Sequence, residues 1–282
     1  MLSGSDAVAE LVRPPRHLFL SPHYDDIPLS AGGTVRLLAS HGRAPETLIV
    51  FGSEPDPARP LTPFARRLHE QWGFTAAEVI ARRQAEERAA SAVIGAKPRL
   101  LPFRDAIYRE DHYLSDDDLF GRPADAEGAL PDRLIAALDL PSMPNPNVRL
   151  YAPLAIGRHV DHQLVQRAGM LLARQGWDVW FYEDIPYALK PGAFAARLAE
   201  IEQTMEKAPV ARIPVQSTWE AKIDGILRYP SQLETIFRNY VGVGTSREEI
   251  SEALQAYARE AGEGEFVERF WKMKYASSRE GS

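Results

Sequence analysis

Short apolar runs alternate with stretches of helical periodicity along the first part of the chain. The apolar run at 17–21 predicts a buried strand. Residues 29–41 repeat apolar side chains at helical spacing and end before Gly42, a residue favoured just beyond a helix. The run at 47–51 predicts a second strand. Because a strand, a helix and a strand in this order form a parallel pair with a right-handed crossover, we expect the start of a parallel sheet.

The same alternation continues further along the chain. The predicted elements are a helix at 76–94, a strand at 99–103, a strand at 147–153, a helix at 160–174 and a strand at 177–182. We therefore expect an α/β fold, a Rossmann-like three-layer sandwich with a mostly parallel sheet and helices on both faces.

The chain carries no internal repeat and no long linker. Its 282 residues, 45% of them hydrophobic, suffice to bury one core. We expect a single domain over 1–282, with 1–16 as an N-terminal extension and 217–282 packed on the same domain. That last part contains predicted helices at 222–239 and 247–261 and a predicted closing strand at 266–275.

Two segments have no periodicity from which a shape can be predicted. The acid-rich stretch 104–127 predicts a long loop with short helical pieces, and 184–191 follows a predicted strand. The aromatic residues of the preceding strand, Trp177, Trp180 and Phe181, are predicted to belong to the core.

Composition excludes several kinds of site and partner. Cysteine is absent, so a metal must be held by nitrogen and oxygen ligands, as zinc or Fe²⁺ can be. The net charge of −6 lacks the basic surplus that nucleic-acid binding requires. No apolar stretch approaches the length of a membrane span, and the first residues lack the apolar region of a signal peptide. We expect a cytoplasmic protein with neither a nucleic-acid nor a membrane partner.

Two clusters of histidine and aspartate follow predicted strands. SPHYDD occupies 21–26 and GRHVDH occupies 157–162. Both would lie at the carboxyl edge of the sheet, where α/β folds bind ligands. A catalytic zinc site needs three protein ligands and one open position. His23, Asp26 and His162 satisfy that count.

The other members of the clusters suit proton transfer. Asp25 could accept a proton from a metal-bound water, and His159 could stabilise an oxyanion or protonate a leaving amine, with Asp161 holding its ring. The alternative is that these residues cap helix N-termini. Each cluster alone leaves that alternative open, whereas their joint occurrence favours the metal site.

The remaining histidines are predicted to have no role in chemistry. Three are expected to be structural and His112, in the polar loop, to be exposed; the structural ones are His17, His41 and His69. Neither G-x-G-x-x-G nor a P-loop is present, which disfavours a nucleotide cofactor.

The chain resembles the PIG-L/LmbE-like family of zinc-dependent N-acetyl sugar deacetylases. The family motifs are [AS]-H-P-D-D with a following G-G-T and a later H-P-D-H, which stand here as SPHYDD, AGGT and GRHVDH. The similarity extends from about 17 to 232 and includes segments at 82–88, 101–105, 182–187 and 229–232.

This resemblance implies a set of residue roles. Zinc would be held by His23, Asp26 and His162, with Asp25 as the general base and His159 and Asp161 at the oxyanion and departing amine. Arg83 and Asp105 stand where similar proteins contact sugar hydroxyls. Arg83 could instead pair with Glu86 on a solvated helix face.

The implied activity is hydrolysis of the acetamide of an N-acetylated amino sugar or glycoconjugate, a small-molecule substrate. The alternatives are hydrolysis of another N-acyl group, as on a glycosylated natural product, and a sugar-binding protein that has lost catalysis. The resemblance leaves self-association into a homo-oligomer open.

The chain departs from the family pattern at three positions. Tyr24 and Val160 replace prolines, so both loops lose a fixed φ angle. Gly157 stands where some relatives carry a tyrosine near the reaction centre, which indicates a different substrate.

Overall fold

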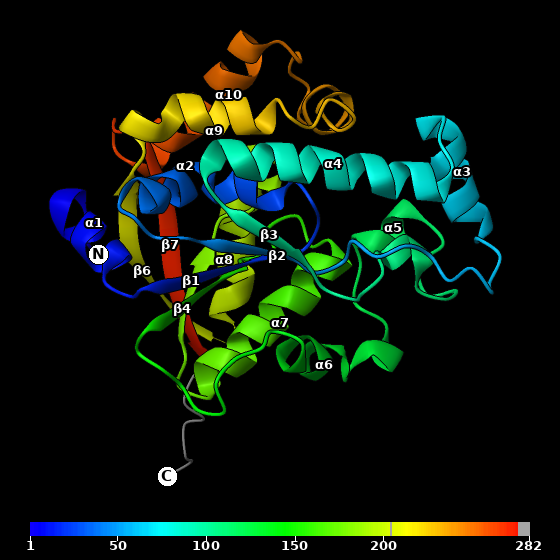
Figure 1. Ribbon diagram of the computed structural model, residues 1–282, viewed down its shortest axis with the longest axis horizontal. Helices are drawn as coiled ribbons and strands as arrows, with labels where there is room; N and C mark the ends of the chain where they lie inside the picture. Colours follow the sequence, from blue (N-terminus) through cyan, green and yellow to red (C-terminus); the bar gives the residue numbers. More distant parts are fainter. Residues whose placement is uncertain (204, 276–282) are drawn as a thin grey trace.

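A seven-stranded sheet forms the centre of the computed structural model, which describes residues 1–203 and 205–275 (Figure 1). The strand order is β3-β2-β1-β4-β5-β7-β6. The first five strands in this order are parallel, whereas β7 is antiparallel to both of its neighbours. The bounds are β1 Arg16–Ser21, β2 Glu46–Ile49, β3 Lys97–Leu100, β4 Val148–Pro153, β5 Asp178–Tyr182, β6 Met205–Pro214 and β7 Val267–Tyr275.

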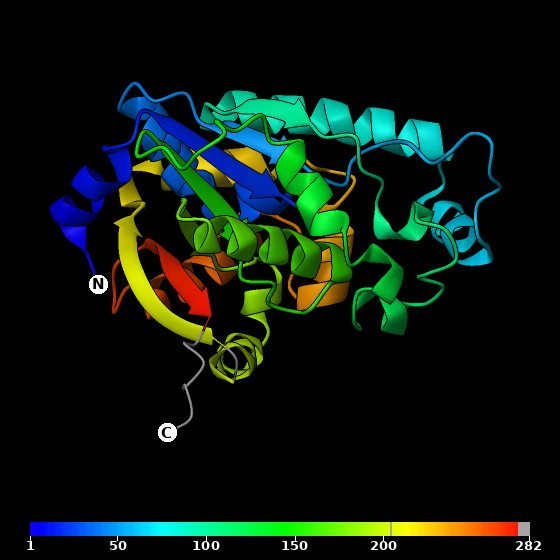
Figure 2. The same cartoon turned by 90° about the horizontal axis from the view of Figure 1, so that it is seen from below.

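Helices cover both faces of this sheet. Figures 1 and 2 place α2, α4 and α9 on one face and α6 and α7 on the other. The expected three-layer α/β fold is confirmed. The helix bounds are α1 Gly4–Val12, α2 Asp26–Ser40, α3 Pro63–Trp72, α4 Ala76–Ile94, α5 Asp116–Leu119, α6 Leu130–Ala136, α7 Val160–Arg174, α8 Ala193–Glu202, α9 Trp219–Ile226 and α10 Arg247–Ala261.

The order in which strands are added to the sheet reverses at β1. The chain runs from β1 through β2 to β3 on one side and then continues with β4 on the other side of β1. The carboxyl ends of β1 and β4 therefore form the topological switch point at which open α/β sheets bind ligands. Both histidine clusters follow these two strands.

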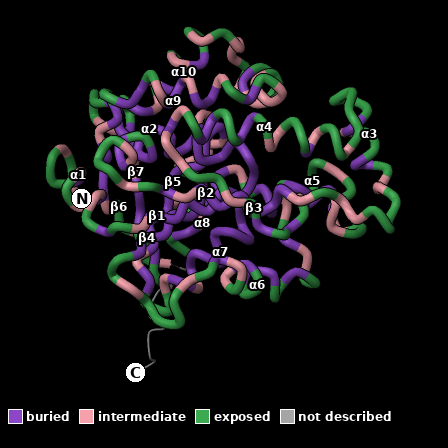
Figure 3. Tube along the Cα trace, in the orientation of Figure 1, coloured by how far each residue is buried: buried purple, intermediate pink, exposed green. Residues whose placement is uncertain are grey.

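The core lies between the sheet and its helices. Burial is concentrated on the central strands, while the tips of outer loops are exposed and α3 buries only Phe64, Ala65 and His69 (Figure 3). Trp177, Trp180 and Phe181 are buried, as predicted. No helix in the described part of the chain is long and apolar enough to cross a membrane.

Helix α4 illustrates how local sequence sets an element that reaches the site. Thr75 and Glu78 form a reciprocal capping box at its start, and Gly95 ends it with φ of 79°. The helix spans the predicted range 76–94 and carries Arg83 toward the carboxyl edge of the sheet.

Some predictions about the fold were wrong in detail. The helix predicted at 29–41 begins at Asp26 and is kinked at Ala31. The helix predicted at 222–239 is two segments, because α9 ends before Pro230 and a π-helical turn covers Glu234–Val241.

The N-terminal extension is part of the packed structure. Helix α1 buries Ala7 and Leu11, and the Leu2 amide donates a hydrogen bond to the Val210 carbonyl of β6. Strand β6 was not predicted, because it lacks an apolar run and contains Pro209 at a register shift.

Candidate active site

The first cluster lies in a tight turn between β1 and α2. Ser21 Oγ donates to the His23 carbonyl at 2.6 Å, and the His23 amide donates to Asp26 Oδ2 at 2.6 Å. Two tyrosine hydroxyls tie this loop to its surroundings: Tyr24, within the loop, donates to the Gly52 carbonyl, and Tyr229 donates to the Tyr24 carbonyl. These bonds constrain a loop that lacks the proline of the family pattern.

The second cluster forms the start of α7. His159 is the N-cap residue, and its Nδ1 accepts a hydrogen bond from the Asp161 amide at 3.2 Å. The capping alternative therefore holds for this ring. It does not hold for Asp25, whose carboxylate makes no capping bond at the start of α2.

The fold brings three imidazole rings together. Ring centroids are 4.9 Å apart for His23 and His159, 5.5 Å for His23 and His162, and 5.7 Å for His159 and His162. Residues separated by nearly 140 positions thus form one polar centre at the switch point.

His23, Asp26 and His162 form a group that could hold a metal ion. Their ligand atoms all lie within 4.8 Å of one another. His23 Nδ1 is 3.6 Å from Asp26 Oδ2, and His162 Nε2 is 3.4 Å from Asp26 Oδ1. His162 Nε2 is buried and has no hydrogen-bond partner among the residues described. Two imidazole nitrogens and one carboxylate suit zinc and leave a fourth position open.

In both predicted histidine ligands, the ring nitrogen that faces away from Asp26 bonds to another carboxylate. His162 Nδ1 donates to Asp184 Oδ1 at 2.6 Å, and His23 Nε2 donates to Asp161 Oδ2 at 2.9 Å. Each bond fixes the tautomer and directs the other ring nitrogen toward Asp26, as is usual for histidines that bind metals. The ligand atoms of a second group, His23, His159 and Asp161, also lie within 4.8 Å of one another, but His23 Nε2 and Asp161 Oδ2 are already bonded to each other and His159 Nδ1 to the Asp161 amide.

Comparison with known proteins agrees with this geometry. The PIG-L family model, described as GlcNAc-PI de-N-acetylase, matches residues 18–173, which is more than half of the chain. The chain belongs to the PIG-L family. The resemblance predicted from the two motifs is confirmed, and the protein is a hydrolase of the deacetylase type.

Two relatives of this PIG-L protein carry the same description. The 2'-N-acetylparomamine deacetylase of Niallia circulans is 34% identical over 190 residues, 60% of this chain and 66% of that one, just under two thirds of its length. The 2'-N-acetylparomamine deacetylase of Streptomyces fradiae is 32% identical over 235 residues, 80% of this chain and 76% of that one.

Several solved structures that resemble this chain are described as deacetylases. A deacetylase of teicoplanin biosynthesis has a TM-score of 0.70 at 26% identity and covers 93% of this chain and 99% of its own. The A40926 pseudoaglycone deacetylase has a TM-score of 0.65 at 25% identity, covering 94% and 100%. A teicoplanin deacetylase was also solved in a zinc-inhibited form, with a TM-score of 0.70.

The electrostatics of this PIG-L site favour a cation between Asp26 and His162. Burial opposes ionisation of Asp26, but His162 and His23 outweigh it and lower the pKa of the carboxyl. Burial likewise opposes protonation of His162, but Asp26 and Asp184 raise its pKa to about 10. A positive charge is therefore stabilised where the ligand atoms converge.

The pKa values of Asp25 and His159 are shifted in opposite directions. Burial raises the pKa of Asp25, with Arg83 acting in the other direction, which suits a general base. Burial and the neighbouring His23 lower the pKa of His159 to about 3, so its ring is neutral at neutral pH. Because Nδ1 accepts from the Asp161 amide, Nε2 carries the proton and can donate a hydrogen bond.

Asp161 is placed differently from the prediction. Its carboxylate does not bond to the His159 ring; it accepts from His23 and pairs with Arg109 Nη1 at 2.6 Å. The carboxylate still favours protonation of His159 through space. The prediction failed because His159 uses its ring nitrogen to cap α7, which leaves the Asp161 carboxylate facing the other cluster.

Arg83 and Asp105 both lie beside the clusters. Arg83 Nη2 donates to Asp25 Oδ2 at 3.2 Å, and Asp105 Oδ2 is 3.7 Å from His23 Nε2. The alternative pairing of Arg83 with Glu86 is wrong, because Arg83 contacts Asp25. Glu86 pairs with Arg82 and accepts hydrogen bonds from Ser231. The sugar contacts implied for Arg83 and Asp105 stay predictions.

Sequence reasoning missed an aromatic wall beside the histidines. Tyr187 lies edge-on to His162 with centroids 5.2 Å apart, and Phe120, 37% exposed, lies edge-on to His159 at 5.4 Å. Gly157 has φ of 82°, and a Cβ there would lie 2.4 Å from Tyr187 Cδ1. The Tyr187 ring therefore occupies the space that a side chain at 157 would need.

The other histidines have structural contacts. His17 bonds to the Tyr151 hydroxyl, His41 Nδ1 to the Leu37 carbonyl at the end of α2, and His69 to the Tyr108 hydroxyl. His112 is only partly exposed and lies 3.7 Å from Glu110.

Asp184 and Arg109 are the polar residues that sequence reasoning missed. Asp184 lies two residues after the end of β5, and that position beyond the carboxyl end of a strand was the signal available. Arg109 lies in a loop without periodicity, and we find no sequence signal for its contact.

Proposed function

We propose that this PIG-L deacetylase hydrolyses the acetamide of an amino sugar in an aminocyclitol glycoside, with zinc held by His23, Asp26 and His162. The convergence of these three ligand atoms is the observation that carries the proposal, and Asp25 lies close enough to Asp26 and His23 for their charges to act on its carboxylate. Two relatives that share about a third of their residues with this chain are described as 2'-N-acetylparomamine deacetylases, which supports this substrate class.

A zinc ion bound at this group would polarise the amide carbonyl and lower the pKa of a water molecule. Asp25 accepts the proton as the water oxygen adds to the carbonyl carbon. Arg83 keeps Asp25 oriented through the contact at 3.2 Å. The raised pKa of Asp25 then allows it to return the proton to the amine nitrogen as the carbon–nitrogen bond breaks. The products are acetate and a free amine.

His159 stabilises the negative charge that develops on the carbonyl oxygen. Its neutral ring presents Nε2–H as a donor, because Nδ1 is held by the Asp161 amide. A donor oriented in advance costs no reorganisation during the reaction. This role requires no protonated imidazole, in keeping with the low pKa of His159.

Arg83 and Asp105 are proposed to bind sugar hydroxyls. Arg83 offers further guanidinium N–H donors besides the one that contacts Asp25, and Asp105 offers a carboxylate acceptor. A donor and an acceptor side by side suit vicinal hydroxyl groups, which can donate and accept at once.

Release of acetate from defined substrates tests this proposal. Metal-stripped protein is reloaded with zinc at one equivalent and assayed with 2'-N-acetylparomamine, N-acetylglucosamine and a longer N-acylglucosamine. We expect turnover of the paromamine derivative and its loss on chelation. Turnover of the longer acyl substrate alone would replace the acetyl specificity by that of another amide hydrolase. No turnover of any substrate by metal-loaded protein would favour the sugar-binding alternative.

Zinc as the native metal is tested by the same reloading. Fe²⁺ in an anaerobic assay is the matched comparison, since imidazole and carboxylate ligands also accept it. Cytoplasmic location and self-association stay predictions.

A further inference from the structure

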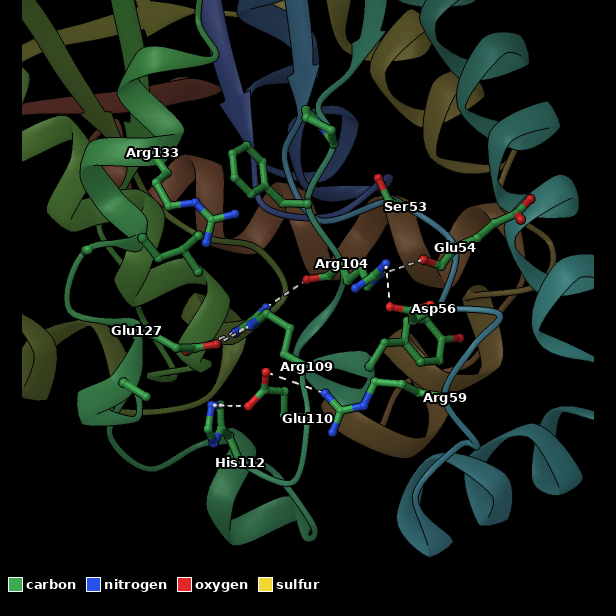
Figure 4. Close-up of a pocket in the computed structure, with 16 residues that line it drawn as sticks. Ser53, Glu54, Asp56, Arg59, Arg104, Arg109, Glu110, His112, Glu127 and Arg133 are labelled. Carbon is green, nitrogen blue, oxygen red and sulfur yellow. Dashed lines mark hydrogen bonds and ion pairs between the residues drawn. The ribbon is translucent and has the colours of Figure 1, made fainter.

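Arg109 lines a polar cavity and also contacts the Asp161 carboxylate of the second cluster. The cavity has a volume of about 600 Å³, and Arg109, Arg104, Arg133 and Glu127 line it (Figure 4). None of the three predicted metal ligands lines this cavity. The Arg109 side chain is only 11% exposed, against 43% for Arg104, because its guanidinium turns inward.

The inward contact of Arg109 is an ion pair with a fully buried carboxylate. Its Nη1 lies 2.6 Å from Asp161 Oδ1, and the Asp161 side chain has no exposed surface. The other oxygen, Oδ2, accepts from His23 Nε2 at 2.9 Å and from the Ala106 amide at 3.2 Å. Arg109 is the only basic side chain paired with Asp161 among the described residues, apart from His23 itself.

The outward contacts of Arg109 hold its guanidinium in one orientation. Nε and Nη2 both donate to the Glu127 carboxylate, and Tyr113 donates its hydroxyl to the same carboxylate. The guanidinium also lies over the rings of Phe51 at 4.7 Å and Tyr113 at 5.4 Å. The planar fork therefore contacts two carboxylates at once, which a lysine ammonium cannot reproduce.

We propose that Arg109 is a positioning residue for the metal site. It holds the Asp161 carboxylate in place through the contact at 2.6 Å, and Asp161 in turn holds His23 with Nδ1 directed at Asp26. Without Arg109, the buried Asp161 carboxylate would keep only His23 and the Ala106 amide as partners, and it would rotate, because a buried charge without its partner is costly. Rotation would remove the acceptor of His23 Nε2–H. This inference rests on the metal site of the proposed function.

Zinc affinity is the direct measure of this role. Carboxylates that hold a ligating histidine typically contribute about 10–100-fold to metal affinity. We expect Arg109→Met to weaken zinc binding by about tenfold or more, measured by competition with a chromophoric chelator. Arg104→Met is the matched control. Arg104 lines the same cavity, but its guanidinium contacts Asp56 and not the metal group.

A double-mutant cycle separates this role from a general loss of structure. If Arg109 acts through Asp161, then Arg109→Met should weaken zinc binding little further in an Asp161→Asn background. Circular dichroism and the unfolding midpoint of the metal-free variants verify the fold. Should Arg109→Met not fold, Arg109→Lys replaces it, with an expected loss of several-fold because lysine cannot contact Asp161 and Glu127 together.

The outcomes are distinct. Folded Arg109→Met, or folded Arg109→Lys in its place, with the zinc affinity of the unchanged protein overturns the inference, as does full additivity in the cycle. An unchanged protein that binds no divalent metal overturns the proposed function as well. Equal losses in Arg104→Met and Arg109→Met would trace the effect to the cavity wall, which also overturns the inference.

Discussion

Replacing Asp184 by asparagine tests whether the metal site depends on the residues that surround it. Asp184 Oδ1 accepts from His162 Nδ1 at 2.6 Å, and both side chains are fully buried. Asparagine has almost the same shape and volume but carries no charge. The substitution therefore removes the charge from this bond without opening a cavity.

The expected magnitude follows from the type of bond. A hydrogen bond to a charged group contributes about 1.5–3 kcal/mol, and a factor of ten in affinity corresponds to ~1.4 kcal/mol. Asp184→Asn should therefore weaken zinc binding by about 10–100-fold, the range found for carboxylates behind metal-ligating histidines. Turnover at saturating zinc should fall less, because Asp25 and His159 keep their contacts.

Zinc binding is measured by competition with a chromophoric chelator, and folding by circular dichroism and urea denaturation. Asp178→Asn is the matched control. Asp178 is the first residue of β5, the strand that precedes Asp184, and it forms an ion pair with Arg149 of β4 at 2.6 Å but does not contact the metal group. The control should lose stability and keep zinc affinity. A folded Asp184→Asn protein that binds zinc as tightly as the unchanged one would refute the reasoning.

Three further predictions concern the base, the ligands and the surrounding core. Asp25→Ala should keep zinc and lose about 10²–10⁴-fold in turnover, whereas His162→Ala should lose zinc too; equal near-native rates would contradict both roles. Gly157→Ala should lower the urea unfolding free energy by at least about 1 kcal/mol, because of φ 82° and the Tyr187 contact; unchanged stability would contradict this. Burial raises the pKa of Glu87 from 4.5 to about 7, so the folded state binds a proton more tightly than the unfolded state, and this contribution to stability is largest below pH 4.5 and is lost as pH rises to 7. Between pH 5 and pH 8 the unfolding free energy of Glu87→Gln should therefore rise by roughly 2 kcal/mol relative to that of the unchanged protein. Parallel curves of unfolding free energy against pH for the two proteins would contradict the shift.

Local patterns identified the elements whose signals lie within one segment. The helix at 76–94 could be delimited from sequence because its capping residue, periodicity and terminal glycine are all local. The helix at 160–174 was delimited in the same way. The two motifs also identified the ligand candidates, because each follows a strand whose apolar run is continuous.

Elements that depend on a distant partner were not predicted. Strand β6 forms because β7, some sixty residues later, supplies its hydrogen bonds and apolar contacts. The segment after α9 breaks its helical pattern at Pro230, and its π-helical turn depends on packing that no periodicity expresses.

The amino-acid sequence alone determined the α/β class, the two clusters and the identity of the three ligand candidates, because residue type and spacing are properties of the chain itself. Only the tertiary structure decided which residues bond to the outer nitrogen of each histidine ligand: Asp184 bonds to His162, and Asp161, paired with Arg109, bonds to His23. These partners come from separate loops, and burial makes each charge depend on the next. Such dependence arises only when the chain has folded and water is excluded.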